Sequence, residues 1–107
     1  MVIFNSTFML VKELESDLIL WLKGEIIKLQ RTGGLTEGCH PRVSAMREAC
    51  GVSHEHADTA SVAFQVEFPT IEAGRQWELD NFVDVVTEFE DKFKVEGMVF
   101  TSFFEVV

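Results

Sequence analysis

The segment 50–58 contains the side chains whose types come closest to a metal site. It reads Cys-Gly-Val-Ser-His-Glu-His-Ala-Asp, and thiolate, imidazole and carboxylate groups are ligands that zinc uses. A His-x-His pair with one nearby cysteine matches no standard structural spacing, and polar residues at a hairpin tip are usually only solvated. Cys39 and His40 cannot join readily, because the strand between them and Cys50 spans about 25–30 Å. We therefore predict free cysteines, no metal and no cofactor.

The sequence offers no recognisable catalytic nucleophile either. It has no Gly-x-Ser-x-Gly elbow, and adjacency of Cys39 and His40 does not place a base against a thiol. The glycine-rich stretch 32–38 follows an expected helix instead of opening one, whereas a phosphate cradle needs amide groups at a helix N-terminus. We predict that this stretch is a helix end and a turn, and we assign no catalytic residue.

Size and charge exclude several classes of protein. The 107 residues form one expected domain, 1–107, and 47% of them are hydrophobic, which is enough for a core. The net charge of −9 disfavours nucleic acid and anionic membrane surfaces as partners. No apolar run approaches the roughly 18 residues of a membrane span, and the N-terminus lacks the features of a signal peptide. We expect a cytoplasmic protein with reduced cysteines.

The elements that must position any site follow from hydrophobic periodicity. Apolar residues alternate over 60–68, and strand-like runs cover 2–11, 42–50 and 98–107. Helices are expected from 15 to about 31 and from about 71 to 93, the second capped by Thr70. The order βαββαβ predicts an α+β, ferredoxin-like fold: a four-stranded antiparallel sheet with both helices on one face. The first and third strands would be central and the other face open.

Helical spacing predicts which side chains the helices bury. The stripe of the first helix consists of Leu18, Trp21, Leu22, Ile26 and Leu29. The stripe of the second consists of Leu79, Phe82, Val86, Phe89 and Phe93, with a possible break at Asp80-Asn81.

The parity of the strands predicts the open face. Placing the more apolar parity of each strand against the helices leaves a half-polar set outside, comprising Asn5, Thr7, Met9, Ser61, Ala63, Gln65, Glu67, Val99, Thr101, Phe103 and Glu105. Such a mixed face suits a partly polar dimer interface that encloses a cavity. The predicted ligand-binding residues are its inward polar groups, Asn5, Thr7, Gln65, Glu67 and Thr101. Glu67 or Glu105 could serve as a base if desolvated.

Several short motifs resemble a family of small bacterial proteins known only as a domain of unknown function. These are the N-terminal Met-Val-Ile-Phe-Asn-Ser-Thr, Trp21-Leu22-Lys23, the strand 61–68, Asp91-Lys92-Phe93 and the closing Phe-Phe-Glu-Val-Val. The resemblance implies a ferredoxin-like fold paired as a dimeric α/β barrel and implies no activity. Members tend to have a His-Ile-Pro-like stretch after the tryptophan, where this chain has Ile26-Ile27-Lys28, so no role rests on that histidine.

Two functional hypotheses remain open from the sequence. The favoured one is a non-enzymatic homodimer that binds a small molecule or a protein through its open face. The alternative is a small dimeric α/β-barrel enzyme of the cofactor-independent monooxygenase or isomerase type, an analogy of fold alone. RNA binding is rejected, because recognition sheets need aromatic pairs beside Lys or Arg, and the third strand offers Ala63, Gln65 and Glu67.

Overall fold

A computed structural model describes residues 1–46, 59–93 and 98–107 of the chain. The strands are β1 Val2–Val11, β2 Arg42–Ala45, β3 Thr59–Phe68 and β4 Met98–Glu105. The helices are η1 Lys12–Leu14, α1 Glu15–Arg31, η2 Glu37–Cys39, α2 Ile71–Trp77, η3 Glu78–Phe82 and α3 Val83–Phe93. The predicted histidine loop, Cys50 and the end of the second predicted strand lie outside these residues, so those expectations stay predictions.

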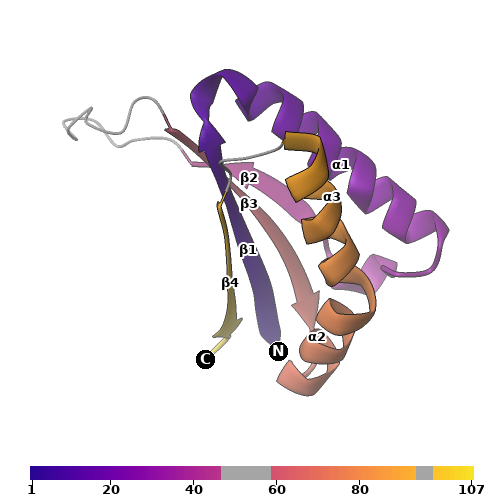
Figure 1. Cartoon of the computed structure of the whole chain (residues 1–107). Coiled ribbons are helices and arrows are strands. Elements are labelled where there is room, and N and C mark those ends of the chain that lie inside the picture. Colours follow the sequence, from indigo (N-terminus) through magenta and orange to yellow (C-terminus); the bar gives the residue numbers. More distant parts are fainter. Residues whose placement is uncertain (47–58, 94–97) are drawn as a thin grey trace.

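The four strands form one antiparallel sheet in the order β2-β3-β1-β4. β1 and β3 are central and pair along their whole length, from Val2 opposite Phe68 to Val11 opposite Thr59. Figure 1 shows α1 and the α2–α3 segment on one side of this sheet, with the other side uncovered. The α+β class, the antiparallel sheet and the single helical layer are as predicted. No helix among the described residues is long and apolar enough to cross a membrane.

The covered face of the sheet is closed by aromatic rings. Phe4 of β1 and Phe64 of β3 are 0% and 1% exposed at its centre. The ring of Phe4 meets those of Trp77 and Phe82 edge-on, at centroid distances of 5.3 and 4.8 Å. Phe64 stacks on Trp77 at 6.2 Å. Edge-on and offset ring contacts stabilise a fold beyond the burial of their apolar area. This cluster therefore stabilises the packing of the helices on the sheet.

Helix α1 ends where the sequence predicts. Gly33 has a φ of 82°, a left-handed conformation that glycine adopts without strain. The next residue, Gly34, donates its N–H to the carbonyl of Leu29 at 2.8 Å and accepts a hydrogen bond from the indole Nε1 of Trp77 at 2.6 Å. The turn after α1 is thereby tied to the second helix.

The second predicted helix is interrupted by a π-helical segment, η3, at the predicted break. Trp77 and Phe82 are both buried although they are five residues apart. In a regular α-helix that spacing would separate them by about 140° around the axis, whereas a π turn brings residues i and i+5 together. Leu79, predicted in the buried stripe, is instead 69% exposed. That prediction was wrong because it assumed one unbroken α-helical period.

Candidate binding face of the sheet

The uncovered side of the sheet, here called the open face, is built from alternate residues of all four strands. On β1 and β3 the burial alternates without a break between fully buried and half-buried positions. The half-buried set includes four of the five predicted site residues: Asn5, Thr7, Gln65 and Glu67. The parity of the two central strands was therefore predicted correctly, and these four side chains share one surface.

Strand β4 has the opposite orientation to the one predicted. Val99 and Phe103 pack against the core, and a Cβ added to Gly74 of α2 would lie 2.7 Å from the Phe103 ring. Thr101 lies opposite the buried Ser6, and their hydroxyls are 3.3 Å apart. Thr101 therefore faces the helical side and does not belong to the predicted site. Glu105, opposite the buried Val2, is likewise not on the open face.

The error on β4 has a physical cause. The prediction placed the more apolar parity against the helices, but both faces of this edge strand are apolar. Phe100 and Phe104 are opposite Thr7 and Ile3 in the register, so they lie on the open face, where they are 50% and 52% exposed. The open face is consequently more hydrophobic than predicted.

A short chain of polar contacts crosses the middle of the open face. Gln65 donates a hydrogen bond from Nε2 to Oδ1 of Asn5 at 3.0 Å, and Asn5 donates from Nδ2 to the hydroxyl of Thr7 at 3.2 Å. At one side, the guanidinium of Arg42 lies 3.8 Å from the carboxylate of Glu67. These predicted polar residues thus satisfy part of their hydrogen-bonding capacity within one chain.

The strand registers arrange the open face as rows that run across the strands. One row consists of Ser44, Ala63, Thr7 and Phe100, and the next consists of Arg42, Gln65, Asn5 and Ser102. A hollow of about 200 Å³ lies over β2, β3 and β1, lined by Thr7, Ser44, Ala45, Met46, Ser61 and Ala63. Of the five predicted ligand residues, only Thr7 lines it.

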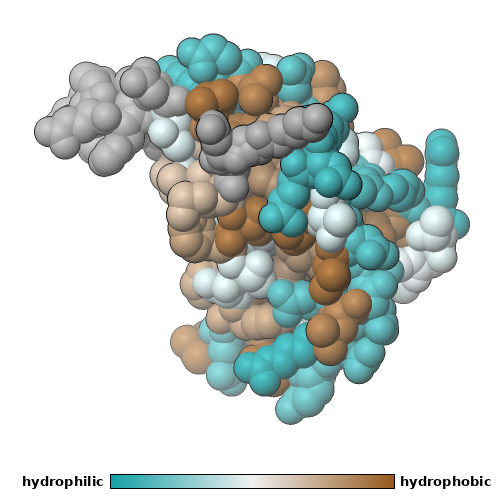
Figure 2. Space-filling view, viewed as in Figure 1, coloured by the Kyte–Doolittle hydropathy of each residue, from teal (hydrophilic) through white to brown (hydrophobic). Residues whose placement is uncertain are grey.

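Charge is distributed unevenly between the two sides of the molecule. The chain has 18 acidic and 9 basic residues, yet the described strand residues of the open face include only one of each, Glu67 and Arg42, which lie beside each other. In Figure 2 the sheet side is largely tan, brown and white, while teal gathers over the helices. Within the described strands, the open face therefore combines exposed aromatic and uncharged polar side chains with almost no net charge, in a strongly acidic protein.

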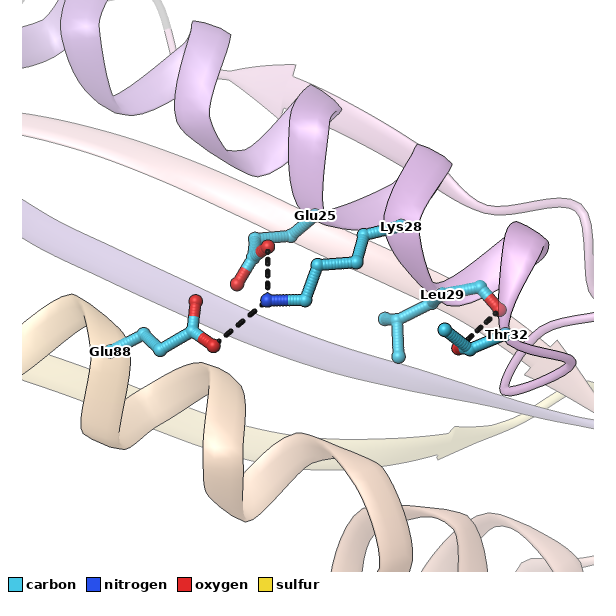
Figure 3. A network of polar contacts seen from close by, with 5 residues as sticks. All are labelled: Glu25, Lys28, Leu29, Thr32 and Glu88. Atoms are coloured by element: carbon cyan, nitrogen blue, oxygen red, sulfur yellow. Dashed lines mark hydrogen bonds and ion pairs between the residues drawn. The ribbon is translucent and has the colours of Figure 1, made fainter.

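A second cluster of polar side chains lies between α1 and α3. The Nζ atom of Lys28 is 3.4 Å from Oε2 of Glu25 and 2.9 Å from Oε1 of Glu88 (Figure 3). Glu25 is 6% exposed, and its other oxygen, Oε1, has no hydrogen-bond partner while both carboxyls are ionised. These residues and Asp84 line a groove of about 180 Å³.

Burial sets the protonation of this cluster. The pKa of Glu25 is raised to about 7, mainly because burial disfavours its charged form. The hydrogen bond to Glu88 and the repulsion between the two carboxylates raise it further, and Lys28 has a weaker, lowering effect. The pKa of Glu88 is lowered by its hydrogen bonds with Glu25 and Lys28. A protonated Glu25 can donate to Glu88, which gives Oε1 the partner that it otherwise lacks.

Sequence reasoning missed Glu25 as a buried residue. The spacing along the helix could have predicted its burial. The buried residues follow the period of one helical stripe, which comprises Leu18, Leu22, Glu25 and Leu29. The stripe was predicted from apolar residues alone, so Ile26 was chosen instead, and it is only half-buried. No group of three or more potential metal ligands occurs within residues 1–46, 59–93 and 98–107.

Comparison with known proteins supports the fold alone. No family model matches the chain, and no curated protein sequence matches it. Among solved structures, the chain is similar to one described as "De novo designed protein Foldit4", with a TM-score of 0.63 over 99% of this chain and 98% of that chain. The two sequences are 10% identical, so the likeness concerns architecture. The resemblance to a bacterial family of unknown function stays a prediction from short motifs.

Proposed function

We propose that this protein is a non-enzymatic binding module of ferredoxin-like fold that forms a homodimer through its open sheet face. The observation that supports this most is the contrast between that face and the rest of the molecule. Exposed Phe100 and Phe104 lie on the open face, and the only charged residues on the described strands of that face are Arg42 and Glu67, which pair with each other. Depletion of charge around exposed aromatic residues is typical of the centre of a protein–protein interface.

The ferredoxin-like assignment rests on topology. The order of elements along the chain is βαββαβ if the α2–α3 segment counts as one helix, and the strand order is β2-β3-β1-β4. Two βαβ halves with both helices on one face make the first and third strands central, as in that fold.

The size of the open face suits a second copy of the chain. With strands about 4.8 Å apart and a rise of about 3.3 Å per residue, the four strands, of 10, 4, 10 and 8 residues, present about 500 Å². Two such faces would bury about 1,000 Å², which is at the lower limit of specific interfaces. The neutrality of the face matters here, because two molecules of charge −9 repel each other elsewhere.

A small ligand would use the hollow over β2, β3 and β1 instead of the polar set predicted from sequence. The hollow is lined by short side chains, Ser44, Ser61 and Ala63, which suits an apolar group with one or two hydroxyl contacts. The enzymatic alternative has less support, because the one carboxylate of the described open-face strands, Glu67, already lies beside Arg42.

Sedimentation equilibrium between about 1 and 100 μM tests the dimer, a range set by the micromolar affinities of small interfaces. We expect a species of twice the 12.1 kDa chain mass. Phe104→Lys should convert it to a monomer, because it places a charge on each side of the interface. The matched control is Leu79→Lys, which adds the same charge at an exposed apolar residue of the helical layer and should leave the dimer intact.

Two outcomes would contradict the proposal. One is a wild-type protein that sediments as a 12.1 kDa monomer throughout this range. The other is dissociation by Leu79→Lys with no effect of Phe104→Lys, which would move the interface to the helices.

A further inference from the structure

At the level of Phe100, the open face presents a large side chain at one edge of the sheet and small side chains toward the other. Along β4 and the neighbouring part of β1 it presents Met98, Phe100, Phe104, Ile3 and Met9. Along β2 and β3 at the level of Phe100 it presents Ser44 and Ala63, where the 200 Å³ hollow lies. A projecting aromatic ring and a hollow thus occupy the same row, at opposite edges of one sheet.

Two-fold symmetry determines what each half meets in a face-to-face dimer. The axis must lie in the plane between the two sheets. If it runs parallel to the strands and between β1 and β3, each residue keeps its row, but the edges exchange. β4 of one copy then lies over β2 of the other, and Phe100 lies over Ser44 of its partner. Ala63 lies over Thr7, and Gln65 over Asn5.

An in-plane axis perpendicular to the strands gives a poorer fit. It places β4 over β4 and β2 over β2, so that large side chains oppose large ones and the two hollows face each other empty. Interfaces of stable complexes are packed as densely as protein interiors, so opposed voids of this size are unfavourable.

We infer that the partner on the open face is a second copy of the chain, related by a two-fold axis parallel to the strands, with Phe100 of each copy seated in the Ser44–Ala63 hollow of the other. This inference rests on the proposed homodimer and specifies its geometry. It also assigns the hollow to a side chain of the partner and not to a small molecule. Because the contact is isologous, assembly closes at two copies.

An exchange of the two residues tests the geometry. Phe100→Ser removes the ring, and Ser44→Phe fills the hollow, so each change alone should weaken dimerisation by about tenfold or more, as expected for an interface anchor. The double variant Ser44→Phe/Phe100→Ser has the composition of the wild type. Its ring at position 44 faces the serine at position 100 of its partner, so the dimerisation constant should return to within about threefold of wild type.

The outcomes separate this inference from the proposed function. A wild-type dimer whose double variant is no tighter than the weaker single variant overturns the inference and leaves the open-face dimer standing. A wild-type dimer indifferent to both single changes also overturns it. A wild-type monomer overturns both, and a monomer that loses a co-purified small molecule on Ser44→Phe assigns the hollow to a ligand. Far-UV circular dichroism and urea unfolding of each variant ensure that only folded proteins are compared.

Discussion

Both faces of the sheet contain phenylalanine residues, but these are buried on one face and exposed on the other. The covered face buries Phe4, Phe8 and Phe64 completely against the rings of the helices. The open face leaves Phe100 and Phe104 about half exposed and joins Gln65 to Asn5 by a hydrogen bond at its middle. The covered face packs against the helices of the same chain, whereas the proposed partner of the open face is a second copy of the chain. Changes on the first should affect folding, and changes on the second should affect association.

The largest effect is expected on the covered face. Phe64→Ala should lower the free energy of unfolding by about 3–5 kcal/mol, because it removes a buried ring and leaves a cavity beside Trp77 and Phe82. Urea denaturation at a concentration where the protein is monomeric measures this. Phe104→Ala is the matched control and should change the same quantity by less than about 0.5 kcal/mol. If both variants lowered the free energy of unfolding equally, the proposed difference in role between the two faces would be wrong.

A smaller effect comes from Glu25, which lies between the helices, away from both faces. Because its pKa in the folded protein is raised to about 7, the folded state keeps a proton that the unfolded state loses near pH 4.5. Stability from this group is present below pH 4.5 and is lost as the pH rises to about 7. The loss is at most about 3–4 kcal/mol, at about 1.4 kcal/mol per unit of pKa difference, and the lowered pKa of Glu88 opposes part of it.

Urea unfolding of Glu25→Gln between pH 4.5 and 8 isolates this contribution. The variant should lose that part of the pH dependence and be more stable than wild type at pH 8. Glu90→Gln, an exposed change of the same charge on α3, should keep the wild-type slope. A wild-type slope in both variants would show that Glu25 is ionised when buried.

The polar row of the open face should matter at the level of one hydrogen bond. Gln65→Leu removes the side chain that donates a hydrogen bond to Asn5. In the proposed dimer, Gln65 also lies opposite Asn5 of the other copy. We expect dimerisation to weaken by about 1 kcal/mol with little change in monomer stability. Sedimentation measures the first and dilute urea unfolding the second. An intact dimer that no longer retains a co-purified small molecule would instead make this row a ligand site.

The smallest effect tests the corrected orientation of β4. Thr101→Val removes the hydroxyl that faces Ser6 and should cost no more than about 1 kcal/mol of monomer stability, with no change in dimerisation. Ser102→Val on the open face is the neighbouring control. A change in dimerisation caused by Thr101→Val alone would restore Thr101 to the open face.

The sequence predicted most of the fold because its strongest patterns were unambiguous. Strict alternation in β3, and a run matching Val2–Val11, fixed the two central strands and placed Asn5, Thr7, Gln65 and Glu67 on one face. The prediction failed on β4, where either set of alternate residues could have been the apolar, buried one. β4 is apolar on both faces, so parity could not orient it, and only its register with β1 does so.

The remaining errors arose from treating residue type as a proxy for burial. Glu25 occupies a buried helical position despite its charge, and Leu79 is exposed despite its hydrophobicity. In the first case spacing alone gave the better answer. In the second, the spacing itself changed within the helix, which composition does not reveal.

The π-helical segment has a consequence for how this chain can vary in length. An extra residue in a helix normally rotates everything beyond it by about 100°, which turns a buried stripe toward solvent. Glu78–Phe82 already absorbs such a rotation, since Trp77 before it and Val85 and Phe89 after it all contact the same core. Removing one residue here would leave a regular α-helix in which Trp77, Val85 and Phe89 still face the sheet, because their spacings of 8 and 12 residues would become 7 and 11. The segment therefore accommodates one residue more than a regular α-helix would, and we expect a second helix that is one residue shorter at this point to keep the same buried stripe.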